Sequence, residues 1–142
     1  MGWDRVAGSF LIGIEPDPAR LSEWGQIEGW LSASRRRSQC EGQLIGPHDV
    51  LWVARQFMGE KPVARAVGCA TAALSEDGRS IIVGDLGGNG LGWIAPLLAE
   101  LTKWAKAEGA ADVRALCRPG WRRILPALGC VQQGDWFVKE VP

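Results

Sequence analysis

The sequence predicts a mixed α/β fold, in which an antiparallel meander leads through a central glycine turn into a crossover helix. Three consecutive apolar segments are joined by short polar turns, a pattern typical of a meander. A glycine-rich stretch then precedes a long segment with helical periodicity, and another strand pattern follows. Strands joined by a helix pair in parallel, so a mixed sheet with packed helices is expected. The meander segments span 50–57, 63–74 and 79–86.

The N-terminal part of the chain predicts one strand and one helix. Residues 10–14 are apolar and end at a proline-containing turn, as expected of a short strand. Asp17 suits a helix cap and Pro18 the first helical position. The helix is expected to end near 35–37, because three arginines stabilise the negative end of the helix dipole. A further helical turn is expected over 39–45. The apolar side of the main helix comprises Leu21, Trp24, Ile27, Trp30 and Leu31.

The central stretch, 79–109, reads as strand, glycine turn and helix. Its strand is rich in β-branched residues, which a buried strand prefers. Pro96 is tolerated only in the first turn of a helix, so the helix should begin near Gly92 or Trp93. Gly109 suits its C-terminal end. A helix that starts behind a glycine turn offers backbone amides to an anion. The glycines, which permit positive φ and close backbone approach, are Gly84, Gly87, Gly88, Gly90 and Gly92.

The C-terminal part continues the alternation of strands and helices. Residues 112–118 alternate between apolar and polar side chains and predict a strand. A shorter helix is expected over 121–128, closed by Gly129. The tail, 130–141, is strand-like and is interrupted at Gly134. The 142 residues suit one compact domain, over 1–142, with a sizeable core.

Composition and charge exclude several classes of function. The formal net charge is zero, so no bulk attraction to nucleic acid or to an anionic membrane is expected. No apolar run is long enough to span a bilayer, and Asp4 and Arg5 interrupt the apolar core that a signal peptide would need. The cysteines lack paired spacing and predict free thiols in a reducing compartment. They are Cys40, Cys69, Cys117 and Cys130.

The order of predicted elements, with a glycine turn between the fourth strand and the main helix, resembles the GNAT (Gcn5-related N-acetyltransferase) fold. In that family the turn carries Arg/Gln-x-x-Gly-x-Gly/Ala, and its amides hold the pyrophosphate of acetyl-CoA. The segment from Asp85 to Gly90 has this spacing. The resemblance therefore implies that the amides of Gly88, Asn89 and Gly90 face a pyrophosphate. Segments 87–88, 104–109 and 118–121 also resemble small GNAT-like proteins encoded by tailed phages.

Two departures from the family pattern bear on chemistry. Asp85 stands where the family has Arg or Gln, and a carboxylate about 5 Å from a phosphate costs about 3 kcal/mol per charge pair at an effective dielectric near 20. The family's usual general acid is a Tyr four residues before the Gly-Phe that follows the second helix. Leu125 occupies that position here, and the chain contains no Tyr. Acetyl transfer uses a base for the amine and an acid for the thiolate. Asp85 and Glu76 are the candidate bases, and Asp85 has a structural alternative in satisfying loop amides.

Other residue constellations favour structural roles. The single histidine, His48, lies in a loop, where a surface position outweighs a catalytic dyad with Cys40 or Cys69. Histidine and cysteine do not cluster at metal-ligand spacing, so no metal site is predicted. The sequence also lacks a nucleophile elbow, a Walker lysine and a dinucleotide-binding glycine pattern.

Aromatic and arginine side chains toward the chain ends are candidate interface residues. Most of the eight tryptophans lie on predicted apolar faces and are expected in the core. Exposed tryptophans, by contrast, are enriched at the energetic centres of protein interfaces, often beside arginines. The candidates are Trp3, Arg118, Trp121, Arg122, Arg123 and Trp136.

Two functions follow from the resemblance and its departures. The first is a degenerate, non-catalytic GNAT-like phage protein, a virion structural or accessory component that contacts other phage proteins and needs no cofactor. The second is an active acetyl-CoA-dependent N-acetyltransferase that modifies an amine. Asp85 and Leu125 favour the first. Both place the protein in a phage virion or the host cytoplasm, neither secreted nor in a membrane, with nucleic acid unexpected as a partner.

Overall fold

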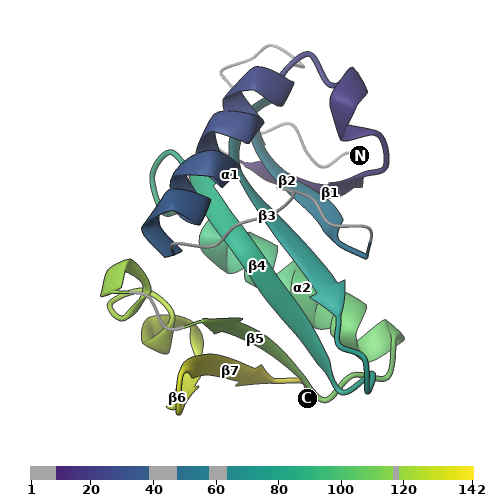
Figure 1. The fold of residues 1–142 in the computed structure, drawn as a ribbon, viewed down its shortest axis with the longest axis vertical. Coiled ribbons are helices and arrows are strands. Elements are labelled where there is room, and N and C mark those ends of the chain that lie inside the picture. The colour runs from purple at the N-terminus through teal and green to yellow at the C-terminus, as the bar shows by residue number, and fades with distance from the viewer. Residues whose placement is uncertain (1–8, 39–47, 58–63, 117–118) are drawn as a thin grey trace.

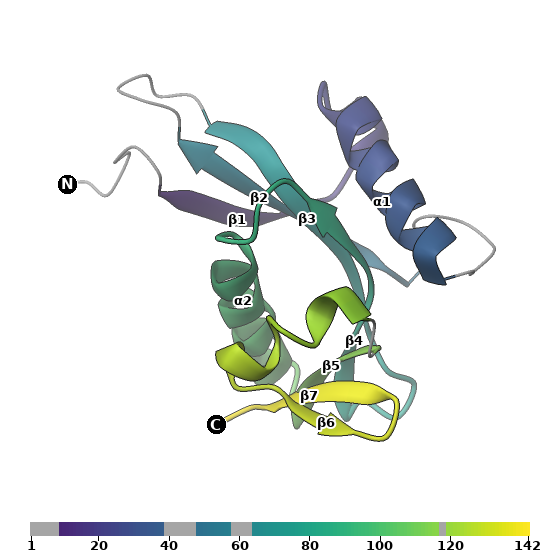
Figure 2. The same cartoon turned by 90° about the vertical axis from the view of Figure 1, so that its left-hand side faces the viewer.

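A computed structural model describes residues 9–38, 48–57, 64–116 and 119–142 (Figure 1). These residues form a seven-stranded sheet and two α-helices, together with three short 3₁₀ turns. Helix α1 covers one face of the sheet and helix α2 the other, as the edge-on view makes plain (Figure 2). The strands are β1 (Phe10–Glu15), β2 (Val50–Phe57), β3 (Ala64–Leu74), β4 (Ser80–Gly88), β5 (Asp112–Leu116), β6 (Val131–Gln133) and β7 (Trp136–Glu140). The helices are α1 (Trp24–Ser38) and α2 (Ile94–Ala107), and the 3₁₀ turns are η1 (Pro18–Arg20), η2 (Pro119–Trp121) and η3 (Pro126–Leu128).

The sheet is mixed, as predicted, and its strand order is β1-β2-β3-β4-β5-β7-β6. Strands β2 to β4 form the predicted antiparallel meander, β1 pairs antiparallel with β2, and β5, β7 and β6 form a second antiparallel group. The two groups join through the parallel pairing of β4 with β5, which α2 connects. This connection is the crossover expected from the strand–helix–strand pattern.

Strands β4 and β5 pair over only part of their length. The parallel register runs from Ser80 opposite Asp112 to Val83 opposite Ala115. Beyond Val83, β4 continues to Gly88 without β5 beside it, and an irregularity in the β3–β4 register falls at this point. The two strands consequently diverge in Figure 1. This divergence opens the sheet at its centre.

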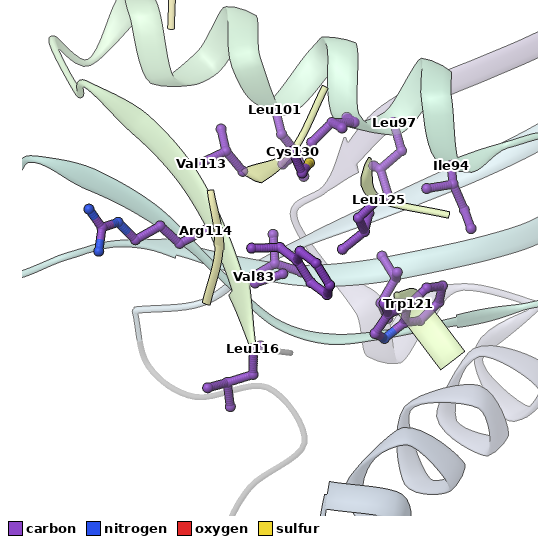
Figure 3. Close-up of a pocket in the computed structure, with 15 residues that line it drawn as sticks. Val83, Ile94, Leu97, Leu101, Val113, Arg114, Leu116, Trp121, Leu125 and Cys130 are labelled. Carbon is purple, nitrogen blue, oxygen red and sulfur yellow. The ribbon is translucent and has the colours of Figure 1, made fainter. Parts of the chain in front are cut away.

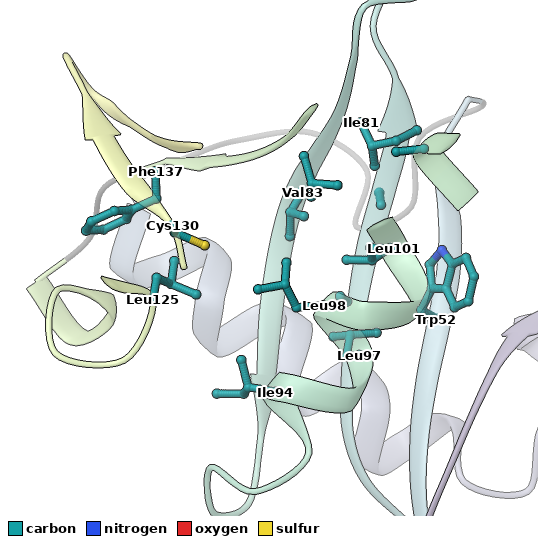
Figure 4. Packing of buried hydrophobic residues seen from close by; sticks show 14 of the residues in the cluster. Trp52, Ile81, Val83, Ile94, Leu97, Leu98, Leu101, Leu125, Cys130 and Phe137 are labelled. Carbon is teal, nitrogen blue, oxygen red and sulfur yellow. The ribbon is translucent and has the colours of Figure 1, made fainter. Parts of the chain in front are cut away.

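The core consists of two apolar clusters, one on each face of the sheet. Beneath α2, the buried side chains of Leu97 and Leu101 belong to a cluster that also includes Ile81 of β4 and Phe137 of β7 (Figure 4). Beneath α1, Ile27 is fully buried in a smaller cluster with residues of β2 and β3. Each fully buried aliphatic side chain contributes roughly 1.5–3 kcal/mol. The two clusters therefore fix both helices against the sheet.

Two predicted helices differ from those observed. The first α-helix begins at Trp24 rather than Pro18, because Leu21 has an extended backbone (ψ 132°) that separates a 3₁₀ turn from α1. The second, expected over 121–128, is instead two 3₁₀ turns with a hydrogen-bonded turn between them. Pro126 has no amide hydrogen and cannot continue a helix at that point. The turn predicted over 39–45 lies outside the described residues.

The glycine-rich stretch is divided between β4 and the following turn, which corrects the prediction of one continuous turn. Gly84, Gly87 and Gly88 lie within β4. A Cβ added at Gly87 would lie 2.9 Å from the Trp30 carbonyl oxygen of α1, so this glycine lets the helix approach the strand. Gly90 is the residue of the stretch with positive φ, at 70°. The bend toward α2 is therefore confined to residues 89–93.

Candidate functional site

The turn between β4 and α2 presents backbone amides to solvent. The Asn89 amide donates to the Val67 carbonyl oxygen at 2.7 Å and is therefore occupied. The amides of 90–93 find no acceptor among the described residues, and 89–92 are exposed. These amides precede a 14-residue helix, whose dipole adds partial positive charge at this end. The turn is therefore suited to bind an anion such as a phosphate.

A cavity of about 40 Å³ lies where β4 and β5 diverge (Figure 3). It is bounded by side chains from β4, α2, β5 and the segment around η2 and η3, and it is partly open to solvent. The guanidinium of Arg114 extends away from the other lining side chains in Figure 3 and pairs with Asp112. The apolar walls suit an uncharged, slender group. The walls include Val83, Leu86, Ile94, Leu97, Leu101, Val113, Trp121, Leu125 and Phe137.

The cavity lies close to the amides of the turn, although its lining includes none of residues 87–93. Leu86 and Ile94 line the cavity and flank the turn on either side in the sequence. The cavity then runs along the first two turns of α2, from Ile94 to Leu101. A ligand that carries both a phosphate and a thin, mainly uncharged arm would contact the turn with the phosphate and reach the cavity with the arm.

Asp85 lies away from this site, on the side of β4 that faces α1. Its carboxylate accepts hydrogen bonds from Ser34 Oγ at 3.1 Å and from Arg35 Nε at 3.0 Å. The residue is only 2% exposed, and its own amide donates to Thr71 Oγ1. Its charge is thus compensated beneath α1 and does not oppose an anion at the turn. The same burial leaves the candidate base Asp85 inaccessible to a substrate, whereas the other candidate, Glu76, sits in the β3–β4 hairpin.

The structure also changes how the glycine pattern is aligned with its turn. The spacing x-x-x-Gly-x-Gly fits the sequence twice, starting from Asp85 or from Gly87. Gly88 belongs to β4, whereas Gly90 and Gly92 lie in the turn itself. The alignment that starts at Gly87 therefore places both glycines of the pattern in the turn. In this alignment Gly87 stands at the position where the family pattern has Arg or Gln. Of the three predicted amides, that of Gly90 has no acceptor among the described residues. The amides of 91–93 were not predicted from the sequence.

The lining of the cavity contributes few ionisable groups. Leu125, at the position expected for a general acid, is 5% exposed and carries no hydroxyl. Cys130 is also buried, and this burial raises the pKa of its thiol, with only partial opposition from the charge of Lys139. Arg114 and Cys130 are the ionisable residues of the lining. The described cavity therefore offers no carboxylate or imidazole for proton transfer.

The remaining sequence candidates are scattered over the fold. His48 is exposed in a turn, as expected, whereas Cys69 is buried beneath α1. Burial, together with the nearby charge of Asp85, raises the pKa of Cys69 to about 12, so this thiol is not a nucleophile at neutral pH. No group of potential metal ligands occurs among the described residues. Neither described helix is long and apolar enough to cross a membrane.

The proposed interface residues do not form one described surface. Trp121 is half-buried at the cavity, and Arg122 and Arg123 beside it are exposed. Trp136 is half-buried on β7. Trp3 and Arg118 lie outside the described residues.

Solved structures with the same fold include acetyltransferases. GCN5 from Tetrahymena aligns with a TM-score of 0.66 over 94% of this chain and 96% of that chain, at 9% identity. Aminoglycoside 6'-acetyltransferase type Ii aligns with a TM-score of 0.65 over 93% of this chain and 97% of that chain, at 13% identity. N-acetylglutamate synthase from Neisseria gonorrhoeae, complexed with coenzyme A and N-acetyl-glutamate, aligns with a TM-score of 0.66 over 93% of this chain and 35% of that chain, at 11% identity. No protein-family model matches the sequence, and no curated protein sequence matches it.

These likenesses confirm the predicted GNAT-like fold. At 9 to 13% identity, these structural likenesses show the fold but do not show a particular activity. The likeness to tailed-phage proteins stays a prediction.

Proposed function

We propose that this chain, which has the GNAT fold, is an acyl-CoA-dependent N-acyltransferase that transfers an acetyl group from acetyl-CoA to an amine. The observation that carries the proposal is the proximity of two features, namely the amides of 90–93, which find no acceptor among the described residues, and the apolar cavity at the β4–β5 divergence. Coenzyme A combines a pyrophosphate with a slender pantetheine arm. Both parts of the site are thus suited to one ligand.

Different residues of the site would bind different parts of the coenzyme. The amides of 90–93 would hold the pyrophosphate, and the side chains of β4, α2 and β5 would exclude water from the arm. When bound, acetyl-CoA supplies a thioester whose carbonyl carbon accepts the amine. Asp85 does not oppose this binding, because Arg35 and Ser34 hold its carboxylate beneath α1.

We expect the lack of a hydroxyl at Leu125 to affect the rate of acetyl transfer and not the binding of acetyl-CoA. A positioned acid or base typically accelerates a reaction by about 10²–10⁴-fold. A thiol has a pKa of about 8.5, so the thiolate of coenzyme A can leave without a proton from the protein. Orientation of the two reactants, which supplies a larger effect, remains available. We therefore expect slow transfer that rises with pH as more of the amine loses its proton.

A non-catalytic role is the second candidate, and one observation favours it. Among the described residues, the cavity lining contains no carboxylate, imidazole or hydroxyl for proton transfer. In this alternative the chain is a structural or accessory virion protein of a tailed phage, and Trp121, Arg122 and Arg123 contact other phage proteins. Mass spectrometry of purified particles would find the protein in the virion in this alternative.

Substitutions at Leu91 test the proposed function, because this side chain is 59% exposed on the turn and supports no core contact. Leu91→Glu adds a carboxylate beside the amides, and Leu91→Gln is the neutral control of matched size. A carboxylate about 6 Å from one phosphate charge costs between about 0.7 kcal/mol in water and about 3 kcal/mol at a protein surface. Calorimetry should therefore show roughly threefold to one-hundredfold weaker acetyl-CoA binding for Leu91→Glu alone.

The same preparations should release free thiol from acetyl-CoA when a mixture of amines is added. Equal acetyl-CoA affinity for both Leu91 variants would contradict the assignment of the turn. Normal binding without any transfer to amines would favour the non-catalytic role.

A further inference from the structure

The buried side chain of Trp93 connects the candidate anion-binding turn to the sheet. Trp93 is 2% exposed and directly precedes α2. Its indole Nε1–H donates a hydrogen bond to the Gly90 carbonyl oxygen at 3.0 Å. Gly90 is the positive-φ residue of the same turn. The indole hydrogen bond therefore links the beginning and the end of the turn on its buried side.

Two glycines on adjacent strands form the slot that holds the indole. Gly68 of β3 pairs with Gly88 of β4 in the register of the sheet. A Cβ added at Gly68 would lie 2.3 Å from the Trp93 ring, and one added at Gly88 would lie 2.9 Å from it. These separations are shorter than real Cβ contacts, so the ring lies directly against both backbones. The slot fits this ring because both strands lack side chains there.

The geometry points to Trp93 as a positioning residue that preorganises the turn for a pyrophosphate, an inference that rests on the proposed function. The Gly90 carbonyl is held by the indole, and in a trans peptide the next amide, that of the exposed residue Leu91, points the opposite way. A turn without this bond would sample orientations in which a carbonyl oxygen faces the anion. Binding would then include the entropy of ordering the turn.

The predicted effect is specific to ligands that carry a pyrophosphate. S-acetylpantetheine has the thioester and the arm but lacks the nucleotide and its pyrophosphate. Trp93→Phe keeps an aromatic ring in the slot and removes the Nε1–H donor. We expect it to weaken acetyl-CoA binding about tenfold, which corresponds to about 1.4 kcal/mol and is the typical net contribution of one hydrogen bond. Binding of S-acetylpantetheine should stay within about twofold of wild type.

Calorimetry with the full chain tests this prediction, with Trp104→Phe as the matched control. Trp104 lies in the last part of α2 and packs against Trp52, with ring centroids 5.8 Å apart, away from the turn. A tenfold loss for acetyl-CoA in Trp93→Phe alone would support the inference. Equal losses for both ligands, or no loss for either, would overturn it. If wild type binds S-acetylpantetheine but not acetyl-CoA, the inference fails; if it binds neither, the proposed function fails with it.

A second measurement needs no variant and applies even if Trp93→Phe does not fold. Inorganic pyrophosphate is titrated into wild-type protein labelled with ¹⁵N, and the indole and backbone amide signals are followed. The Trp93 indole signal should shift with the same apparent affinity as the Gly90 and Gly92 amides, while the Trp104 indole stays constant. Shifts of the amides without any shift of the Trp93 indole would overturn the inference.

Discussion

The burial of Asp85 predicts that its removal destabilises the protein by detaching α1 from β4. Asp85→Ala removes the acceptor of two hydrogen bonds, from Ser34 and Arg35, that join the helix to the strand. Asp85→Asn keeps the shape of the side chain but removes its charge. Comparison of the two variants separates the ion pair from the hydrogen bonds.

The size of the effect follows from the geometry of the pair. At 3.0 Å and an effective dielectric of 20, the attraction between Asp85 and Arg35 is about 5 kcal/mol, of which desolvation offsets a large part. Breaking a buried pair by removing one partner costs roughly 3–5 kcal/mol. The Arg35 side chain is 18% exposed and can be partly rehydrated, so we expect about 2–3 kcal/mol for Asp85→Ala. For a chain of this size this loss lowers Tm by roughly 6–9 °C.

Urea unfolding of wild type and variants measures this loss, and acetyl-CoA titration of the folded variants provides the functional control. We expect Asp85→Asn to be destabilised by less than Asp85→Ala and to keep its affinity for acetyl-CoA. A double-mutant cycle with Arg35→Met should give a coupling free energy above about 1 kcal/mol. Unchanged stability in both variants would refute the anchoring role. Full stability combined with a hundredfold loss of transfer in Asp85→Asn would instead identify Asp85 as the catalytic base.

The remaining predictions concern packing and titration. Gly87→Ala places a Cβ 2.9 Å from the α1 backbone and should destabilise the protein by about 1–3 kcal/mol, whereas Gly29→Ala, within α1 and with open space around it, should stabilise by about 0.5–1 kcal/mol in urea unfolding. An equal change in stability for the two substitutions would contradict the close approach of α1 to β4. Burial alone would raise the pKa of Asp112, but hydrogen bonds from Arg114 and Ser80 outweigh it and lower the pKa below its usual value. Because its pKa is lower in the folded state, ionised Asp112 stabilises the fold. This contribution to stability is complete above the unfolded pKa of about 3.9 and is lost as pH falls through the folded pKa. Asp112→Asn should therefore be about 1–2 kcal/mol less stable at pH 7, and the difference should vanish in acid unfolding series between about pH 4 and pH 2.

The strands were predictable because their apolar patterns are long and their turns carry strong signals. The pattern of 50–57 matches β2 at both ends, and Gly78 adopts the positive φ (72°) expected of its hairpin. The C-terminal tail is broken at Gly134, again as predicted. The start of α1 was misplaced because Pro18 also suits a 3₁₀ turn, and the choice depends on the extended backbone of Leu21.

The site was only partly predictable, because glycine serves two purposes in the stretch 84–92. A glycine that permits close packing and a glycine that permits positive φ look identical in the sequence. Gly87 and Gly88 serve the first purpose and Gly90 the second. The partner of Asp85 lies 50 residues away on α1, so the sequence could not reveal on which face of β4 its charge is compensated. The slot for Trp93 depends on Gly68, which belongs to another strand.

A crystal structure of the protein with acetyl-CoA would show directly whether the turn and the cavity hold the coenzyme. We expect pyrophosphate oxygens within about 3 Å of the amide nitrogens of 90–93, a pantetheine arm between β4 and β5, and Asp85 still paired with Arg35. Coenzyme located elsewhere on the molecule, or no coenzyme at millimolar concentration, would contradict this expectation.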